Sequence, residues 1–222
     1  MTTRALPLKE SPDGEVERYS LTERLWHWLA SLSYTYCTLT GLALFSPYLY
    51  WLAAVFGGGP TIRFWHPWLG LVFLASVVWM HGNWRDDLRL TEADREWRAK
   101  IGSYVENRDQ ELPPQARFNA GQKLFYWAMF YAVLVLLLSG IVMWFPERVP
   151  RNLIVILPVV VILHEAAALI SIGAIIIHIY MSVFAEPESL RAMVHGKVSR
   201  AWARNYHRLW YEKIQGQRRP VP

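Results

Sequence analysis

The sequence is poor in cysteine. Its 222 residues include only one, Cys37, so the chain cannot form an internal disulfide or supply the thiolates of an iron–sulfur cluster. Cys37 lies inside an apolar run, where a cysteine usually serves as a small packing residue. Internal repeats and low-complexity segments are also missing. Metal chemistry must therefore rest on other side chains.

Charged residues are scarce in four apolar runs, each near the length needed to cross a bilayer. The chain is 53% hydrophobic with 12 Trp, and Trp and Tyr gather at the ends of the runs, as at membrane interfaces. Residues 1–20 contain no apolar core before a small-residue cleavage site, so we expect no removable signal peptide. We predict an all-α integral membrane protein, a four-transmembrane-helix bundle that forms a single domain over residues 1–222. The predicted spans are 24–46, 64–84, 120–145 and 153–184.

The charge distribution predicts the orientation. With four spans, the N-terminal arm, the loop 85–118 and the tail 186–222 lie on one side of the membrane. Of the 23 Lys and Arg residues, only Arg63, Arg148 and Arg151 lie on the other side. The positive-inside rule places both termini in the cytoplasm. The net charge of +5 then reflects topology and contact with anionic headgroups, so it does not indicate nucleic-acid binding.

Two cytoplasmic segments are expected at the membrane surface. In the loop, Thr91 precedes a mixed-charge helical pattern, which predicts a surface helix. In the tail, a basic segment with Trp202 and Trp210 is typical of a chain that lies along the headgroups.

The fourth run is longer than a bilayer requires. As one helix it would measure about 48 Å, against a hydrocarbon core of about 30 Å. It must tilt, project into water, or begin late near Pro158, and the sequence leaves all three open.

Two histidines, His164 and His178, lie fourteen residues apart on this run. Fourteen residues fall about 40° short of four helical turns and rise about 21 Å, so both imidazoles face one side, near opposite surfaces of the membrane. Ionisable residues inside a membrane mark functional sites. Two haems placed one above the other need such a pair of stacked imidazoles. The other histidines are His27, His66, His81, His195 and His207, and the last two lie in the basic tail, where we expect them to be solvated or interfacial.

Depth in the predicted membrane sorts the remaining histidines into pairs. His66 and His164 lie at similar predicted depths, on the outer side of the membrane. On the cytoplasmic side His178 can pair with His27 or with His81. His66 and His81 diverge by about 60° around their helix, which favours His27 only modestly.

Haem is a better match to this arrangement than the competing explanations. A single intramembrane histidine is more often a hydrogen-bonded packing residue, but four at two matched depths favour ligation. Structural zinc gathers four ligands around one ion, whereas these histidines separate into two pairs. Two axial imidazoles saturate a haem iron, so such a site transfers electrons and leaves no position for O₂.

Several motifs extend this pattern into a family resemblance over roughly residues 18–213. They are Arg24-Leu25-Trp26-His27-Trp28, Phe64-Trp65-His66-Pro67, Arg117-Phe118-Asn119-Ala120-Gly121-Gln122-Lys123, His164-Glu165 with the step to His178, and Arg200-Ala201-Trp202-Ala203 with Trp210-Tyr211. In these motifs the chain resembles the membrane cytochrome b (gamma) subunit of respiratory formate dehydrogenases. The resemblance implies two haem b groups, an outer one on His66 and His164 and an inner one on His27 and His178.

The resemblance also implies a quinone site near the inner haem. Asn119 and Gly121 match positions at that site in the family. His81 lies at a similar depth, where a role toward quinone or a haem propionate is our own inference. Asn119 also fits a helix N-cap, and Gly121 also fits close helix packing, so both residues have a structural interpretation as well.

The partners and the direction of electron transfer follow from the resemblance alone. They are an iron–sulfur (beta) subunit on the outer face and a molybdenum or tungsten catalytic (alpha) subunit beyond it, in a bacterial inner membrane. Electrons are expected to pass from the iron–sulfur subunit across the membrane to menaquinone or ubiquinone at the cytoplasmic side. The open alternatives are the cytochrome b subunit of another molybdoenzyme or hydrogenase, a stand-alone b561-type transmembrane reductase, and a haem-free membrane protein.

Overall fold

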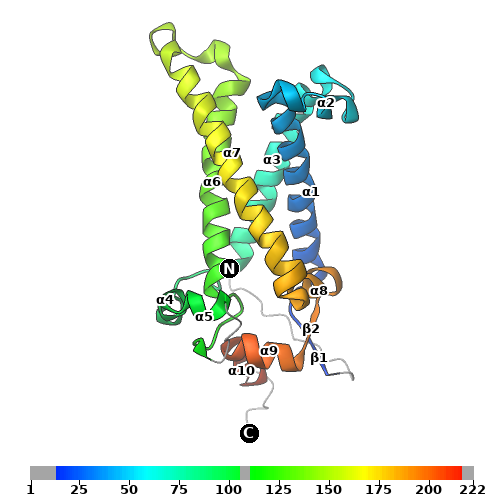
Figure 1. Cartoon of the computed structure of the whole chain (residues 1–222), viewed down its shortest axis with the longest axis vertical. Helices are drawn as coiled ribbons and strands as arrows, with labels where there is room; N and C mark the ends of the chain where they lie inside the picture. The colour runs from blue at the N-terminus through cyan, green and yellow to red at the C-terminus, as the bar shows by residue number, and fades with distance from the viewer. Residues whose placement is uncertain (1–13, 106–110, 217–222) are drawn as a thin grey trace. The chain divides into compact units, whose positions relative to one another are not determined.

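Four long helices dominate the structure, a computed structural model that describes residues 14–105 and 111–216. The helices are α1 (Leu21–Phe45), α3 (Gly59–Trp84), α6 (Ala120–Trp144) and α7 (Leu157–Tyr180), drawn in blue, cyan, green and yellow in Figure 1. Each corresponds to one predicted apolar run, because a long stretch without charge favours a structure that pairs all its backbone groups internally. The all-helical prediction is therefore confirmed at the level of the long elements.

Three helical segments within the described residues are long and apolar enough to cross a membrane. They are residues 59–84, 120–144 and 151–185. The fourth long helix, α1, has 25 residues but carries more polar side chains, so a fourth span stays a prediction. α3 begins at Gly59, earlier than the predicted start at residue 64, and continues through Pro67.

The longest run resolves into three kinds of helix. A 3₁₀ helix, η4 (Arg151–Ile156), precedes α7, and a π-helical turn, η5 (Met181–Ala185), follows it. α7 begins at Leu157, directly before Pro158, whose missing N–H is tolerated in a first helical turn. The α-helical part of the run therefore begins near Pro158, within a helical segment that is continuous over residues 151–185.

The described chain divides into two compact units. The cavity unit comprises residues 25–80 and 128–177, and the tail unit comprises the described residues of 1–24, 81–127 and 178–222. Each of the four long helices contributes residues to both units. The single membrane domain expected from the sequence stays a prediction.

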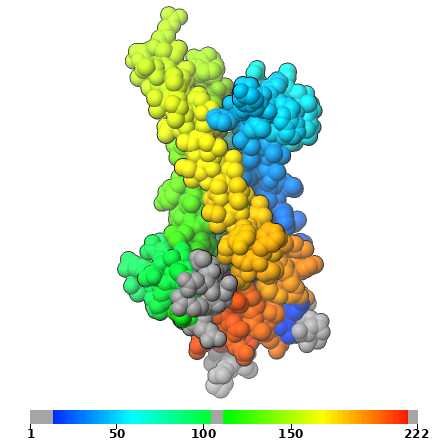
Figure 2. Space-filling view, viewed as in Figure 1, coloured from blue at the N-terminus to red at the C-terminus, as the bar shows by residue number. Residues whose placement is uncertain are grey.

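In the cavity unit, aromatic contacts join the long helices. Trp26 of α1 stacks on Trp79 of α3 with ring centroids 5.3 Å apart, and Trp68 of α3 meets Trp144 of α6 edge-on at 5.2 Å. The short helices η1 (Pro47–Leu49) and α2 (Leu52–Val55) connect α1 to α3. On α7, the yellow helix in Figure 2, the exposed large side chains within this unit are isoleucine, leucine and valine, which suits a lipid-facing surface.

The tail unit is built from short elements. Strand β1 (Glu15–Glu17) pairs antiparallel with β2 (Lys197–Ser199). The helices are α4 (Glu92–Ala99), α5 (Ile101–Val105), α8 (Pro187–His195), α9 (Arg200–Tyr206) and α10 (Arg208–Gly216). Thr91 caps α4 in a capping box with Asp94, so the helix expected after Thr91 is present.

One prediction about a side chain of the tail is wrong. His207, expected to be solvated or interfacial, is only 1% exposed, and its Nδ1 lies 2.6 Å from the Ala116 carbonyl oxygen. The basic sequence around His207 misled because its side chain closes the interior of the unit. Trp202 and Trp210 are also buried within the unit and contact the Arg18 guanidinium at 4.7 and 5.4 Å from their ring centroids. The location of their segment along the membrane surface stays a prediction.

Buried charges hold the tail unit together. Lys123 at the start of α6 donates to Asp94 Oδ2 at 2.7 Å and to the Arg89 carbonyl at 2.9 Å. Both side chains of this ion pair are almost fully buried. Burial opposes ionisation of Asp94, but the hydrogen bonds from Lys123 and Thr91 outweigh it and lower the pKa of the carboxyl. The ion pair thus ties α4 to α6.

Candidate functional site

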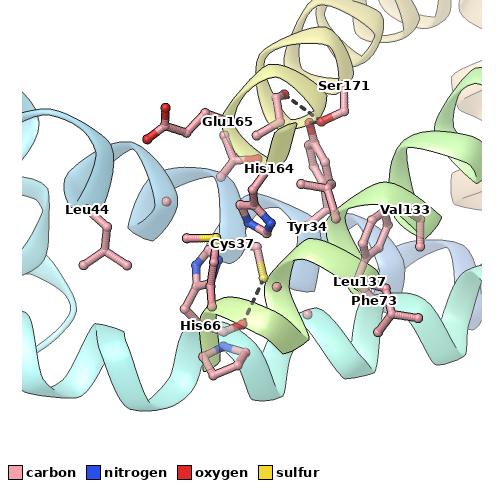
Figure 3. Close-up of a pocket in the computed structure, with 18 of the residues that line it drawn as sticks. Tyr34, Cys37, Leu44, His66, Phe73, Val133, Leu137, His164, Glu165 and Ser171 are labelled. Atoms are coloured by element: carbon pink, nitrogen blue, oxygen red, sulfur yellow. Dashed lines mark hydrogen bonds between the residues drawn. The ribbon is translucent and has the colours of Figure 1, made fainter. Parts of the chain in front are cut away.

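A cavity of about 550 Å³ lies within the cavity unit, in the range of small-molecule and cofactor sites. All four long helices line it, and most of its wall is apolar. The imidazoles of His66 and His164 reach it from α3 and α7 (Figure 3). Arg63 and Glu165 are the charged residues among its lining. The cavity thus combines an apolar wall with two imidazoles, the arrangement expected of a site for a large apolar cofactor.

His66 is held by two neighbouring residues of α1. Its Nδ1 lies 2.8 Å from Thr40 Oγ1. Its ring lies against Gly41, where an added Cβ would come within 3.3 Å of His66 Cε1. The hydroxyl fixes the rotation of the ring, and the missing side chain of the glycine provides the space for it.

His164 is held in the same way by two residues of α6. Its Nδ1 lies 2.9 Å from Ser139 Oγ, and an added Cβ at Gly140 would lie 3.4 Å from His164 Cε1. A hydroxyl followed by a glycine therefore supports each of the two histidines. The pair Thr40-Gly41 was missed in the sequence. Ser139 and Gly140 fit a close approach of helices in the third apolar run, but the sequence did not link them to a histidine.

The spacing of the two rings fits an iron between them. The ring centroids of His66 and His164 lie 6.4 Å apart. Two imidazole nitrogens at about 2.0–2.1 Å from a metal, each roughly 1.2 Å from its ring centre, place the ring centres about 6.4 Å apart. The structure thus brings together the two histidines predicted for the outer haem, and the residues fit the group. Their role as ligands stays a prediction.

The two histidines predicted for the inner haem belong to different units. His27 lies in the cavity unit, where its ring meets Trp28 edge-on at 5.5 Å. His178 lies in the tail unit and stacks on Phe125, with ring centroids 4.4 Å apart and planes 8° apart. The pairing of His178 with His27 stays a prediction, and so does the alternative with His81.

His81 has a polar aromatic neighbour in the tail unit. Its Nδ1 lies 3.0 Å from the Tyr126 hydroxyl, and the ring of Trp127 meets it edge-on at 5.8 Å. Tyr126 was not singled out from the sequence, because a tyrosine near a helix end resembles a membrane-interface residue. The pair offers a polar hydrogen bond beside an aromatic wall.

Asn119 and Gly121 both have structural roles at the start of α6. Asn119 Oδ1 accepts from the Gln122 N–H at 2.8 Å, and Gln122 Oε1 accepts from the Asn119 N–H at 3.1 Å, a reciprocal capping pattern. An added Cβ at Gly121 would lie 3.3 Å from Trp97. These contacts match the structural interpretations, and a quinone role for either residue stays a prediction.

Comparison with known proteins places these observations in a family. The family model described as prokaryotic cytochrome b561 matches residues 18–196. The chain is 30% identical over 200 residues to the Escherichia coli K12 formate dehydrogenase cytochrome b556(fdo) subunit, covering 90% of this chain and 93% of that protein. It is 28% identical to the nitrate-inducible cytochrome b556(Fdn) subunit of the same strain, over 90% of this chain and 92% of that protein.

The chain is also similar to a relative from a second organism. The formate dehydrogenase cytochrome b556 subunit of Haemophilus influenzae is 28% identical over 210 residues, covering 91% of this chain and 85% of that protein. These relatives confirm the resemblance found from the motifs.

Proposed function

Because the chain belongs to the prokaryotic cytochrome b561 family, it is a membrane cytochrome b, and we propose that it serves as the di-haem membrane subunit of a formate dehydrogenase complex. The observation that carries the proposal is the pair of imidazoles 6.4 Å apart in an apolar cavity. The names of the relatives support the choice of formate dehydrogenase. In this role the chain transfers electrons from an iron–sulfur subunit to a quinone.

His66 and His164 would hold the outer haem, and His27 and His178 would hold the inner one. Haem b supplies reversible one-electron transfer when bound. The protein would supply one imidazole nitrogen from each histidine of a pair, an apolar wall that excludes water, and fixed ring orientations. With two imidazoles bound to each iron, the site would have no open coordination position for substrate. Its chemistry would therefore be electron transfer.

Quinone binds on the cytoplasmic side near the start of α6. His81 and Tyr126, hydrogen-bonded at 3.0 Å, offer a group that donates a proton to a quinone oxygen. Asn119 and Gly121 lie at the N-terminal end of α6. Backbone N–H groups at the N-terminal end of a helix favour a partly negative oxygen. The quinone takes its protons from the cytoplasm, so quinone reduction and proton uptake occur on the same side.

The proposed topology is a single domain with four spans and both termini in the cytoplasm of a bacterium, in the inner membrane. An iron–sulfur subunit docks on the outer face, and a molybdenum or tungsten subunit lies beyond it. The asymmetry of Lys and Arg supports the orientation. The family and the three apolar segments support the membrane location.

Haem content per chain tests the proposal. The complete protein is purified in detergent, and haem is quantified with a reduced-minus-oxidised spectrum. We expect two b haems in the wild type and about one in His66→Ala, His27→Ala and His178→Ala. His81→Ala should keep both haems and lose quinone reduction.

Two results would contradict parts of this proposal. If His81→Ala loses a haem and His27→Ala does not, the inner haem is bound by His81 of α3 and not by His27. A wild-type protein without haem, after haem supplementation during expression, rejects the electron-transfer function. Purification together with two larger subunits separates the proposed complex from a stand-alone reductase.

A further inference from the structure

The hydroxyls of Thr40 and Ser139 each have two kinds of neighbour. Thr40 Oγ1 lies 2.7 Å from the Tyr36 carbonyl oxygen of its own helix and 2.8 Å from His66 Nδ1. Ser139 Oγ lies 2.5 Å from the Val135 carbonyl oxygen and 2.9 Å from His164 Nδ1. Each hydroxyl has one hydrogen for these neighbours, and a carbonyl oxygen can only accept.

This arrangement decides which imidazole nitrogen carries the hydrogen. If the hydroxyl donates to the carbonyl, Nδ1–H donates to the hydroxyl, and two hydrogen bonds form. If the hydroxyl donates to Nδ1 instead, only one forms, and an Nε2–H is left in a largely apolar cavity. Leaving a buried donor unsatisfied is unfavourable. Both histidines therefore carry the hydrogen on Nδ1 and keep the Nε2 lone pair free.

We propose that Thr40 and Ser139 are positioning residues for the outer haem, a role that rests on the proposed ligation by His66 and His164. By accepting from Nδ1–H, each hydroxyl selects the tautomer whose Nε2 can bind iron. It also sets the rotation of the ring and increases the electron density on Nε2. Greater density favours the oxidised iron, so the two hydroxyls lower the reduction potential of the outer haem.

The support is matched on the two sides of the cavity. The two hydroxyls come from α1 and α6, and the two histidines from α3 and α7. In both cases the residue after the hydroxyl is the glycine that contacts the ring edge. One helix of each pair thus supplies the ligand, and the other supplies the acceptor and the space.

Redox titration of the haems in the complete protein tests this inference. Thr40→Val keeps the shape of the side chain and removes the acceptor, and Ser139→Ala removes the other one. In each variant we expect both haems to be retained and the outer haem to become easier to reduce. Its ferrous-to-ferric ratio at a fixed potential should rise about fivefold, the factor that one hydrogen bond is worth. For a one-electron couple this corresponds to roughly 40 mV.

The conservative variants Thr40→Ser and Ser139→Thr keep the hydroxyl and should restore the wild-type potential. The electron paramagnetic resonance signal of the oxidised outer haem should shift in the Val and Ala variants and return in the conservative ones. The outer haem is identified as the one lost in His66→Ala.

The outcomes separate this inference from the proposed function. Unchanged potentials and spectra in Thr40→Val and Ser139→Ala, with two haems bound, reject the positioning role and leave the ligation intact. A shift of the same size in the conservative variants also rejects it, because the hydroxyl is then not the cause. Absence of haem loss in His66→Ala rejects the ligation itself.

Discussion

The two units of the chain bury polar side chains in opposite ways. In the cavity unit the buried contacts are neutral, such as the Tyr34 hydroxyl 2.9 Å from Ser171 Oγ. In the tail unit they are charged, such as Lys123 with Asp94 at 2.7 Å. A neutral hydrogen bond between membrane helices is worth about 0.6 kcal/mol, whereas breaking a buried ion pair costs about 3–5 kcal/mol. Polar contacts therefore orient side chains in the cavity unit and stabilise the tail unit.

The largest effect is expected from breaking the buried ion pair of the tail unit. Lys123→Met leaves the Asp94 carboxylate without its main partner, and we expect a loss of about 3–5 kcal/mol in unfolding free energy. Chemical denaturation of the purified protein, followed by tryptophan fluorescence, measures it. Lys100→Met removes a lysine from an exposed pair with Glu96 at 3.1 Å and should cost less than about 1 kcal/mol. Equal losses would contradict the distinction between buried and exposed charge.

The next effect concerns the space beside His66. Gly41→Ala places a Cβ 3.3 Å from the His66 ring, so the ring must move by a few tenths of an ångström. Overpacking of this kind costs about 1–3 kcal/mol, and we expect reduced retention of one haem, measured as haem per chain. Gly173→Ala is the matched control, because an added Cβ there meets nothing within 4 Å. Full haem retention in Gly41→Ala would show that the ring is not confined.

Acid should destabilise the tail unit through His207. Burial, and next the charge of Arg18, lower the pKa of His207 well below its usual value of 6.5. The folded protein keeps this imidazole neutral, while the unfolded chain takes up a proton as the pH falls below about 6.5. Stability is complete above that pH and decreases by about 1.4 kcal/mol per pH unit below it, until the folded-state pKa is reached.

Denaturation at pH 7.5 and pH 5.5 measures this effect. His207→Gln should lose less stability on acidification than the wild type does. His195→Gln, at an exposed position of the same tail, should keep the wild-type loss. If His207→Gln and the wild type respond equally to acid, the buried imidazole is not the titrating group.

The smallest effect belongs to the neutral pair in the cavity unit. Tyr34→Phe and Ser171→Ala each remove one partner of the 2.9 Å hydrogen bond between α1 and α7. A double-mutant cycle on thermal unfolding should give a coupling of about 0.6 kcal/mol. A coupling as large as the loss of unfolding free energy in Lys123→Met would remove the contrast between the two units.

The long elements follow from the sequence because they depend on local composition. α6 spans Ala120–Trp144, against a predicted 120–145. α3 was predicted too short at its start, because Gly59, Pro60 and Arg63 do not look like the beginning of an apolar helix. The strands β1 and β2 were missed, because three residues are too few to show the alternation that identifies a strand.

The candidate site could also be predicted from the sequence only in part. Histidines in apolar runs are visible in the sequence, and helical periodicity sorts them by depth and face. The supporting residues Thr40 and Ser139 are not identified by the same means, because their contacts depend on how two helices rotate against each other. His207 illustrates the opposite error, since a basic surrounding sequence hid a residue that packing buries.

The pairing of β1 with β2 sets an order of events during synthesis. Glu15 lies opposite Ser199 in this sheet, so the two strands meet only after almost the whole chain has left the ribosome. Every residue of the cavity unit has been made by then. Because contacts between distant parts of a chain form late and slowly, the N-terminal arm has to wait without its partner strand. Closure of this small sheet therefore follows the synthesis of the whole cavity unit, and a truncation before residue 197 removes the partner of β1 altogether.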